Sequence, residues 1–307
     1  MNEPKRHHYI PQFILRNFCD DRQKLNYYDK SRGTVEKRKT SEVFMAYNLY
    51  RDEVNNSEDP VRIEKDLSVF EREIAEILND RFLKDNEIVI SAEEDEKIKL
   101  FFALMGFRSK RTSGVFGEKA SARTKESYST YLDNKNLQDM WKRNLGHLVT
   151  CRSLQDVITS PVIDDPMKAF MIRDAGGPLL RYISIAECHE PYEFVIGDSY
   201  PVEIVGGLIT GQEVELYSVY PISPERVLLL TCPEALEAPN LIRGFRECIV
   251  TKPYRIDDCH TKLKVRKIYA EEINFLNNWI IKNSSEGVAY RSEETGSYLL
   301  SFLRQQK

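Results

Sequence analysis

The spacing of apolar residues differs between two long blocks of this chain of 307 residues, and that difference limits the fold more than any other feature. Between residues 60 and 175, apolar residues recur at steps of three and four, as they do on one face of a helix. Between residues 181 and 230, the apolar runs are short, β-branched or aromatic, and separated by turn residues, which is typical of strands. Gly176-Gly177-Pro178 separates the two blocks. This order of blocks predicts an α+β fold.

Local signals place the individual elements. Ser91 and Glu94 form a capping box, which predicts a helix that runs to about Thr112 before the glycine-bearing stretch 113–119 breaks it. We expect an N-terminal β-hairpin, a central helical block, and a C-terminal antiparallel or mixed sheet on which a terminal helix packs. The chain is predicted to be a single domain, 1–307, with a mostly helical subdomain at 1–175 and a strand-rich one at 176–307. The predicted elements are a short helix over 11–19, hairpin strands at 25–30 and 34–39, a helix over 60–82, one or two helices over 120–148, helices over 152–160 and 164–174, strands at 181–188, 192–196, 202–205, 213–219 and 226–230, and a last clear helix over 270–284.

Charge and composition narrow the class of protein. No window contains about eighteen consecutive apolar residues, so we expect no membrane span, and the N-terminus has no apolar leader. The formal net charge of −4 provides no global attraction to nucleic acid, although a local basic patch remains compatible with it. The six cysteines are scattered without a C-x-x-C pair, which favours reduced thiols and a cytoplasmic location.

The N-terminal stretch from His7 to Phe18 concentrates groups that can act on an anion. His8 can serve as a general base or a metal ligand, and the guanidinium of Arg16 suits phosphate or carboxylate. The alternative is that His7 is exposed and His8 is a hydrogen-bonded anchor for the terminus.

Two later positions extend this candidate site. Asp198 follows an apolar strand, where a carboxylate can be catalytic or can hold a divalent metal, Mg²⁺ or Mn²⁺; it can equally cap a turn through its own backbone. Helical spacing places Arg108 and Arg111 together on the inner edge of their helix, where they need anionic partners from the protein or from a ligand. The alternative is that both favour the dipole at the helix C-terminus.

Two further features of the sequence have both a structural and a ligand-binding interpretation. Asn277 shares a helix face with Ile273 and Ile280, so its amide is expected to point inward, either to fix the fold or to bind a ligand. The stretch from Lys252 to Lys267 contains six basic residues interleaved with Tyr254 and Val265. It is either a contact for a nucleic-acid backbone or a solvated strand face.

Taken in order, these motifs resemble the bacterial family known as domain of unknown function four-two-three-eight. The opening motif of that family, His-Tyr-Ile/Val-Pro-x-x-x-Leu-Arg-x-Phe, is matched from His8 to Phe18. Its strand motif Phe-x-Thr-Ser-Asp-x-Pro-Val is matched around Asp198, except that Ile196-Gly197 replaces Thr-Ser and one extra residue precedes the proline. The resemblance implies a bacterial or phage-related protein without a settled activity. It also implies that His8, Arg16, Arg108 and Asp198 converge at one pocket.

These observations leave two hypotheses for the function. The first is a phosphodiesterase or nuclease, in phage defence, that acts on nucleic acid or nucleotides. In it His8 and Asp198 are catalytic, Asp198 holds the metal, and Arg16, Arg108 and Arg111 bind phosphate. The second is a non-catalytic binding or interaction module, in which the same His/Arg/Asp set is a structural network or senses an anionic ligand. An open pocket around His8 and Asp198 would favour the first hypothesis, and a sealed network would favour the second.

Overall fold

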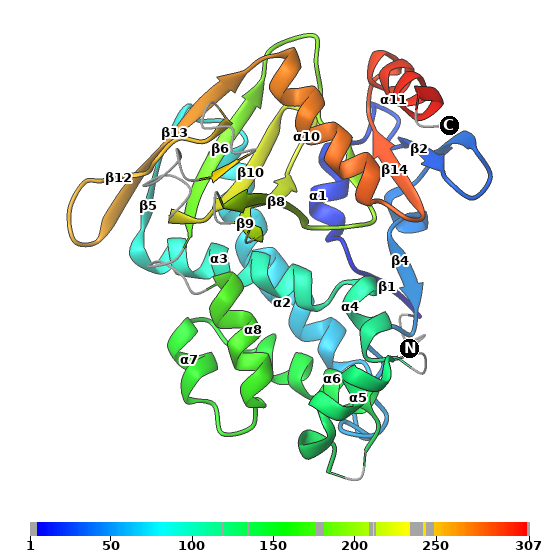
Figure 1. Ribbon diagram of the computed structural model, residues 1–307, viewed down its shortest axis with the longest axis vertical. Coiled ribbons are helices and arrows are strands. Elements are labelled where there is room, and N and C mark those ends of the chain that lie inside the picture. Colours follow the sequence, from blue (N-terminus) through cyan, green and yellow to red (C-terminus); the bar gives the residue numbers. More distant parts are fainter. Residues whose placement is uncertain are drawn as a thin grey trace.

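The computed structural model describes residues 5–117, 120–133, 135–175, 181–208, 211, 213–233, 242–243 and 249–305. Helices fill the lower half of the molecule in Figure 1, and two larger sheets fill the upper half. The α+β class and the order of blocks expected from the sequence are confirmed. The predicted seam at Gly176–Pro178 lies outside the described residues.

The N-terminal segment is built from short strands around one short helix. The first strand pairs with the fourth in a small antiparallel sheet, in which His8 lies opposite Met45. The predicted hairpin is confirmed, with Leu25 opposite Arg38 and Asp29 opposite Thr34. These elements are β1 (Arg6–His8), α1 (Gln12–Asn17), β2 (Leu25–Asp29), β3 (Thr34–Arg38), a 3₁₀ turn (Thr40–Glu42) and β4 (Met45–Tyr47).

The central block contains the predicted helices. The capping box at the start of α3 is confirmed, because the Ser91 hydroxyl accepts from the Glu94 backbone N–H and the Glu94 carboxylate accepts from the Ser91 N–H. The helical elements are α2 (Arg62–Ile77) with a π-helical turn (Leu78–Phe82), α3 (Ala92–Phe107), α4 (Lys110–Val115), α5 (Ala122–Ser127), a 3₁₀ turn (Ser129–Tyr131), α6 (Leu137–Leu148), α7 (Leu154–Thr159) and α8 (Asp165–Ala175).

The helix after Ser91 ends earlier than its periodicity predicts. It stops at Phe107 instead of near Thr112, and a new helix, α4, begins at Lys110. The cause is Ser109, whose hydroxyl accepts from the backbone N–H of Thr112 and so caps a second helix. The first residues of the stretch expected to break the helix, 113–119, therefore belong to α4.

The larger sheet is mixed, and among the described residues its strand pairs are antiparallel except for one. Its order is β11-β8-β9-β10-β6-β13-β12, and β5 pairs with the N-terminal half of β13. The parallel pair joins β6 to the C-terminal half of β13, with Val265 opposite Ile185. The strands are β5 (Glu87–Ser91), β6 (Tyr182–Cys188), β8 (Val202–Leu208), β9 (Glu213–Pro221), β10 (Arg226–Thr231), β11 (Ile242–Arg243), β12 (Tyr254–Arg255) and β13 (His260–Ile268).

The predicted terminal helix is present as α10 (Ala270–Asn283), and two further elements follow it. Strand β14 (Gly287–Tyr290) joins β7 (Ile196–Gly197) to the N-terminal hairpin, in a second sheet of order β3-β2-β14-β7. Helix α11 (Glu293–Gln305) ends the described chain. The two ends of the sequence therefore share one sheet, which local patterns could not predict.

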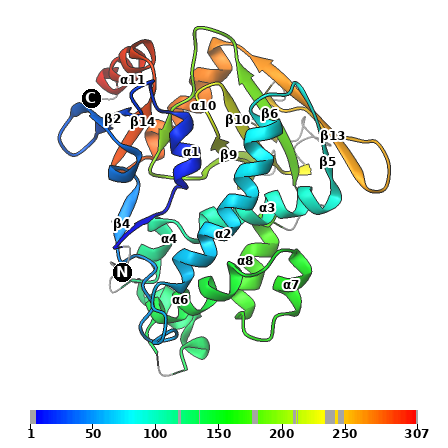
Figure 2. The same ribbon diagram turned by 180° about the vertical axis from the view of Figure 1, so that it is seen from behind.

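Helices cover both faces of the larger sheet. Strand β10 illustrates this, because all six of its residues are buried. Leu228 and Leu230 belong to the core beneath α2 and α3, whereas Val227 and Leu229 belong to the core beneath α10. Helix α10 crosses the near face in Figure 1, and α2 and α3 cover the opposite face in Figure 2. Within the described residues, no helix has the length and apolar character needed to cross a bilayer.

Candidate functional site

His8 is held in a closed ring of hydrogen bonds. Gln12 donates from Nε2 to His8 Nδ1 at 3.3 Å, and its Oε1 accepts from the Thr40 hydroxyl at 3.3 Å. Since Nδ1 accepts, Nε2 of His8 carries the proton, and it donates to the Thr40 backbone carbonyl at 3.2 Å. Burial, assisted by the charge of Arg108, lowers the pKa of His8 to about 4. The imidazole is therefore neutral at pH 7, with both nitrogens engaged by the protein.

His7, which the anchor alternative placed at the surface, is fully buried. Its ring stacks on the Tyr50 ring, with centroids 5.5 Å apart, and its Nδ1 accepts from the Tyr50 backbone N–H at 2.8 Å. Successive side chains of a strand point to opposite sides. Both sides of β1 are covered at this point, so both histidines are buried.

Arg108 lies immediately after α3 and is 1% exposed. Its Nη1 donates to Glu71 at 2.6 Å, and its Nη2 donates to the backbone carbonyl of His8 at 2.7 Å. The Tyr50 ring lies 5.8 Å from the guanidinium carbon, and the Tyr50 hydroxyl donates to the Arg108 carbonyl. Arg108 therefore joins the N-terminal strand to α2 and α3 from inside the protein.

Arg111, which helical spacing placed beside Arg108, is exposed instead. The two arginines do not share a helix face, because α3 ends at Phe107 and the extended backbone of Ser109 begins a separate helix, α4. The two guanidinium groups thus lie in different environments: that of Arg108 is in a buried ion pair, and that of Arg111 faces solvent. The predicted pair of inner-edge arginines is wrong.

His8 and Arg16 line one cavity of about 340 Å³ between α1 and α2. Arg16 from α1 and Arg72 from α2 are exposed, and neither guanidinium has an ion-pair partner among the residues that the structure describes. The remaining wall is mainly polar, with Gln12, Glu64, Ser68 and Glu71 beside Phe13 and Ala75. Arg72 and Glu64 had no motif of their own, so sequence spacing alone could not identify them.

Glu64 has an unusual charge state for a cavity wall. Burial raises its pKa to about 7, with a further contribution from Glu71 and an opposing one from Arg108. The cavity wall therefore contains a carboxyl group that titrates near neutral pH. Since Glu71 is paired with Arg108, the cavity carries its unpaired positive charge on Arg16 and Arg72.

Asp198 caps a distant turn. Its Oδ1 accepts from the backbone N–H groups of Glu286 and Gly287 at 3.0 and 3.2 Å. Its Oδ2 accepts from the Ser285 hydroxyl at 2.7 Å and from the Ser285 N–H at 3.1 Å. The turn that Asp198 holds lies between α10 and β14 rather than in its own segment. Both carboxylate oxygens are thus used to position the final strand.

His8 and Asp198 do not line the same cavity. Asp198 lines a different hollow of about 200 Å³, together with Arg111, Ser199 and Glu203. The predicted site residues are thus distributed over two cavities, with Arg108 in the interior. A chain of contacts does link the two regions, since the Tyr9 hydroxyl donates to Glu286 at 3.2 Å and Glu286 also pairs with Lys110.

Asn277 fixes the fold. Its side-chain oxygen accepts from the Val195 N–H at 3.0 Å, and its side-chain nitrogen donates to the Glu193 carbonyl at 2.9 Å. The amide is 2% exposed. It therefore ties α10 to the segment before β7, and it lines none of the cavities described in this section.

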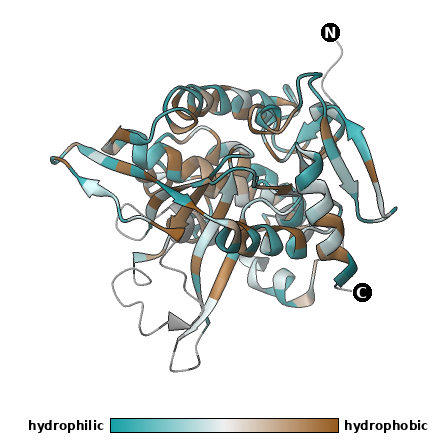
Figure 3. Ribbon diagram, turned by 90° about the horizontal axis from the view of Figure 1, so that it is seen from above, coloured by the Kyte–Doolittle hydropathy of each residue, from teal (hydrophilic) through white to brown (hydrophobic). Residues whose placement is uncertain are grey.

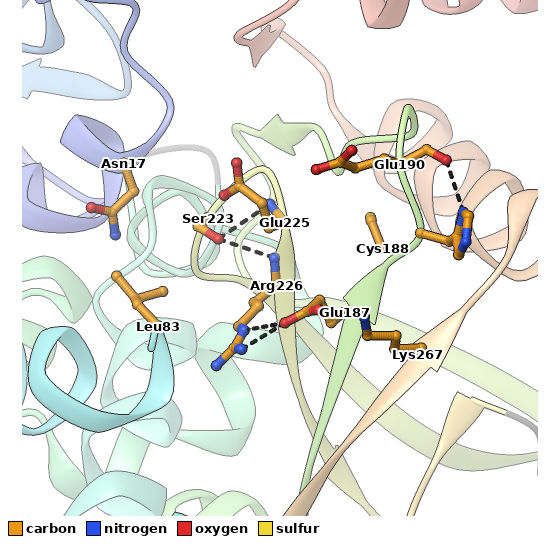
Figure 4. Close-up of a pocket in the computed structure, with 10 residues that line it drawn as sticks. Asn17, Leu83, Glu187, Cys188, Glu190, Ser223, Glu225, Arg226 and Lys267 are labelled. Atoms are coloured by element: carbon orange, nitrogen blue, oxygen red, sulfur yellow. Dashed lines mark hydrogen bonds and ion pairs between the residues drawn. The ribbon is translucent and has the colours of Figure 1, made fainter. Parts of the chain in front are cut away.

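Another cavity, of about 590 Å³, opens where the parallel strands β6 and β13 end (Figure 4). The Arg226 guanidinium points across it to Glu187, with Nη2 and Nε at 2.6 and 2.8 Å from Oε2. Nη1 of Arg226 donates to the carbonyls of Phe82 and Asp85, and Nη2 also reaches Asn86. All five N–H groups of Arg226 are thus satisfied by the protein, so this buried pair joins the sheet to the end of α2.

The fit of a divalent metal can be tested on the donor groups. Among the described residues, no three His, Cys, Asp or Glu side chains lie together as a potential metal-binding set. Asp198 has Glu203 in its cavity, but its oxygens already accept four hydrogen bonds. The donor groups around Asp198 do not fit a metal centre.

Comparison with known proteins places the whole arrangement in a family. No curated protein matches the chain, and no solved structure matches it. A family model described as "Protein of unknown function (DUF4238)" matches residues 6–294, which include His8, Arg108, Asp198 and Asn277. The chain belongs to the DUF4238 family of proteins of unknown function.

Proposed function

We propose that this protein is a non-catalytic binding protein for a small tetrahedral oxyanion, such as a phosphate group, held between α1 and α2. The observation that carries the proposal is the pair of unpaired guanidinium groups, Arg16 and Arg72, on two elements that line one cavity. Planar guanidinium forks are suited to phosphate oxygens and bind them with charge-assisted hydrogen bonds.

The other predicted site residues support binding rather than catalysis. A general base needs a free lone pair within reach of its proton. The Nδ1 lone pair of His8 is occupied by Gln12, and both terminal nitrogens of Arg108 are engaged, Nη1 by Glu71 and Nη2 by the His8 carbonyl. These groups hold the wall of the cavity in place. The nuclease activity, the role in phage defence and the cytoplasmic location expected from the sequence stay predictions.

Calorimetric titration with sulfate tests the proposal, because sulfate mimics phosphate and keeps its charge between pH 5 and 9. We expect wild-type protein to bind one sulfate and the R16A/R72A double variant to lose that binding. Arg111→Ala is the matched control, since Arg111 is also exposed and lines a different cavity. Equal binding by wild type and R16A/R72A, or loss of binding in the Arg111→Ala control alone, would overturn the proposal.

A further inference from the structure

Half of the cations in the basic stretch of the sequence, Lys262, Lys264 and Arg266, lie on one face of a projecting β-sheet wing. Strands β12 and β13 form a hairpin that extends away from the body of the molecule at the left of Figures 1 and 3. The N-terminal half of β13 pairs with β12 on one side and with β5 on the other. We call this three-stranded unit, residues 87–91 and 254–266, the wing.

The two faces of the wing differ sharply. Leu263 and Val265 of β13 are buried against the helical block, together with Ile88 and Ile90 of β5. The alternate residues Lys262, Lys264 and Arg266 point to the other side, because side chains alternate along a strand. Lys264 and Arg266 are exposed and Lys262 is partly exposed. This face is therefore a row of cations spaced by about 6.6 Å, which is two residues of strand rise.

Apolar side chains lie within the same row. Tyr254 and Val89 stand directly opposite Lys262 from the two neighbouring strands, so all three share the outer face. Tyr254 is 69% exposed, Ile256 47% and Val89 43%. An exposed ring beside a row of cations matches the combination that proteins use for single-stranded nucleic acids, in which cations follow the phosphates and aromatic rings stack on bases.

Charge complementarity selects the class of partner. The acidic residue Glu87 lies opposite Lys264 on this face, and its carboxylate pairs with Lys262 at 2.8 Å. Asp257 and Asp258 lie at the tip of the hairpin, where they pair with His260 and Arg255. Away from the tip, the outer face of the wing thus has an excess of positive charge, although the formal net charge of the chain is −4.

We infer that the outer face of the wing binds single-stranded nucleic acid, with Lys264 and Arg266 on successive phosphates and Tyr254 stacked on a base. The spacing of the cations is comparable to the repeat between phosphates of an extended strand. This surface is separate from the cavity between α1 and α2, so the inference does not depend on the proposed anion site.

Fluorescence anisotropy with a labelled oligodeoxythymidylate tests the inference. Replacing both Lys264 and Arg266 by alanine should reduce the slope of log K against log salt by about 1.4, which is about 0.7 for each phosphate that the protein no longer neutralises. Tyr254→Ala should weaken binding about tenfold, whereas Tyr254→Phe should retain it, because stacking needs the ring and not the hydroxyl. Glu87→Gln should tighten binding by removing the competing carboxylate.

Two controls separate this surface from other sites. Lys37→Ala removes an exposed cation from a strand of the other sheet and should leave affinity unchanged. The R16A/R72A variant should also bind the oligonucleotide normally. Loss of oligonucleotide binding in R16A/R72A, or no binding by wild type, would overturn the inference. Polyglutamate that binds as tightly as the oligonucleotide, without sensitivity to Tyr254→Ala, would identify an acidic polypeptide as the partner instead.

Discussion

At the scale of single residues, Arg108 is the buried charge on which the N-terminal half depends. Removing one partner of a buried ion pair leaves the other charge uncompensated, at a cost of about 3–5 kcal/mol. We therefore expect Arg108→Met to lower the free energy of unfolding by that amount, because Glu71 and the His8 carbonyl both lose their donor. Equilibrium unfolding in urea measures it. An Arg108→Met protein as stable as wild type would contradict the structural role.

His8 makes stability depend on pH. Its pKa is about 4 in the folded protein and about 6.5 in the unfolded chain, so below pH 6.5 the unfolded chain binds a proton that the folded protein does not. The contribution of His8 to stability is complete above pH 6.5 and is lost as the pH falls to 4, by up to about 3 kcal/mol. Urea unfolding at pH 7 and pH 5 should show about 2 kcal/mol of this loss in wild type and a smaller loss in His8→Asn. Equal losses in both proteins would contradict it.

The pKa of Glu64 is raised, whereas that of His8 is lowered, and we expect Glu64 to make anion binding depend on pH. Its pKa is raised to about 7, so its negative charge disappears as the pH falls through 7. We expect sulfate to bind more tightly at pH 6 than at pH 8 in wild type, because the neutral carboxyl no longer repels the anion. Glu64→Gln should bind with similar affinity at both values. Calorimetry at the two pH values decides, and a pH dependence that persists unchanged in Glu64→Gln would exclude Glu64 as its source.

Sequence patterns predicted the roles of some single residues but not of others. The types of group in the N-terminal motif can be read from the sequence, but their hydrogen-bonding and protonation state could not be predicted from it. Whether His8 is a base or an anchor depends on Thr40, which is 32 positions away, and on Gln12, whose orientation only the fold defines. Arg72 was missed because an exposed arginine on an amphipathic helix has no local signature.

At the scale of elements, the contact between β7 and α10 explains a departure from the family pattern. Gly197 occupies the position of a serine in the motif that the sequence resembles. A Cβ atom at Gly197 would lie 1.9 Å from the Ser284 hydroxyl and 3.2 Å from Ile280 Cγ2. The glycine therefore allows the strand and the helix end to approach closely.

This contact predicts a compensating pair of substitutions. Gly197→Ser should destabilise the protein by about 1–3 kcal/mol through overpacking. Adding Ser284→Ala should recover part of that loss, because it removes the atom that meets the new side chain. A double-mutant cycle in urea measures the coupling, and strictly additive effects would show that the two positions do not compete for space.

Elements with strong local signals were predicted well, and those defined by distant partners were not. The capping box at Ser91 and the hairpin at residues 25–39 follow from neighbouring residues, and both are confirmed. Strand β14 spans only four residues and exists because β2 and β7 pair with it from far along the chain. The end of α3 was misplaced because no glycine or proline interrupts the sequence between Phe107 and Gly114, whereas Ser109 in fact caps a second helix.

At the scale of the whole molecule, the three regions that carry the predicted site residues are joined by polar contacts rather than opened into one pocket. Arg108 ties the first strand to the helical block, Asp198 holds the turn before the last strand, and Asn277 ties α10 to the segment before β7. Their common role is to connect layers, whereas the binding that we propose involves the exposed cations.

Equilibrium urea unfolding of His8→Ala and Asp198→Ala, with wild type alongside, tests this claim most directly. We predict that His8→Ala lowers the free energy of unfolding by about 2 kcal/mol and Asp198→Ala by about 2–3 kcal/mol, since each change leaves buried or partly buried hydrogen-bonding groups unpaired. The same preparations are to be incubated with DNA and RNA in Mg²⁺, Mn²⁺ or EDTA, where we expect no cleavage by any of them. Wild-type stability in both variants, together with a cleavage activity that only wild type has, would contradict the account.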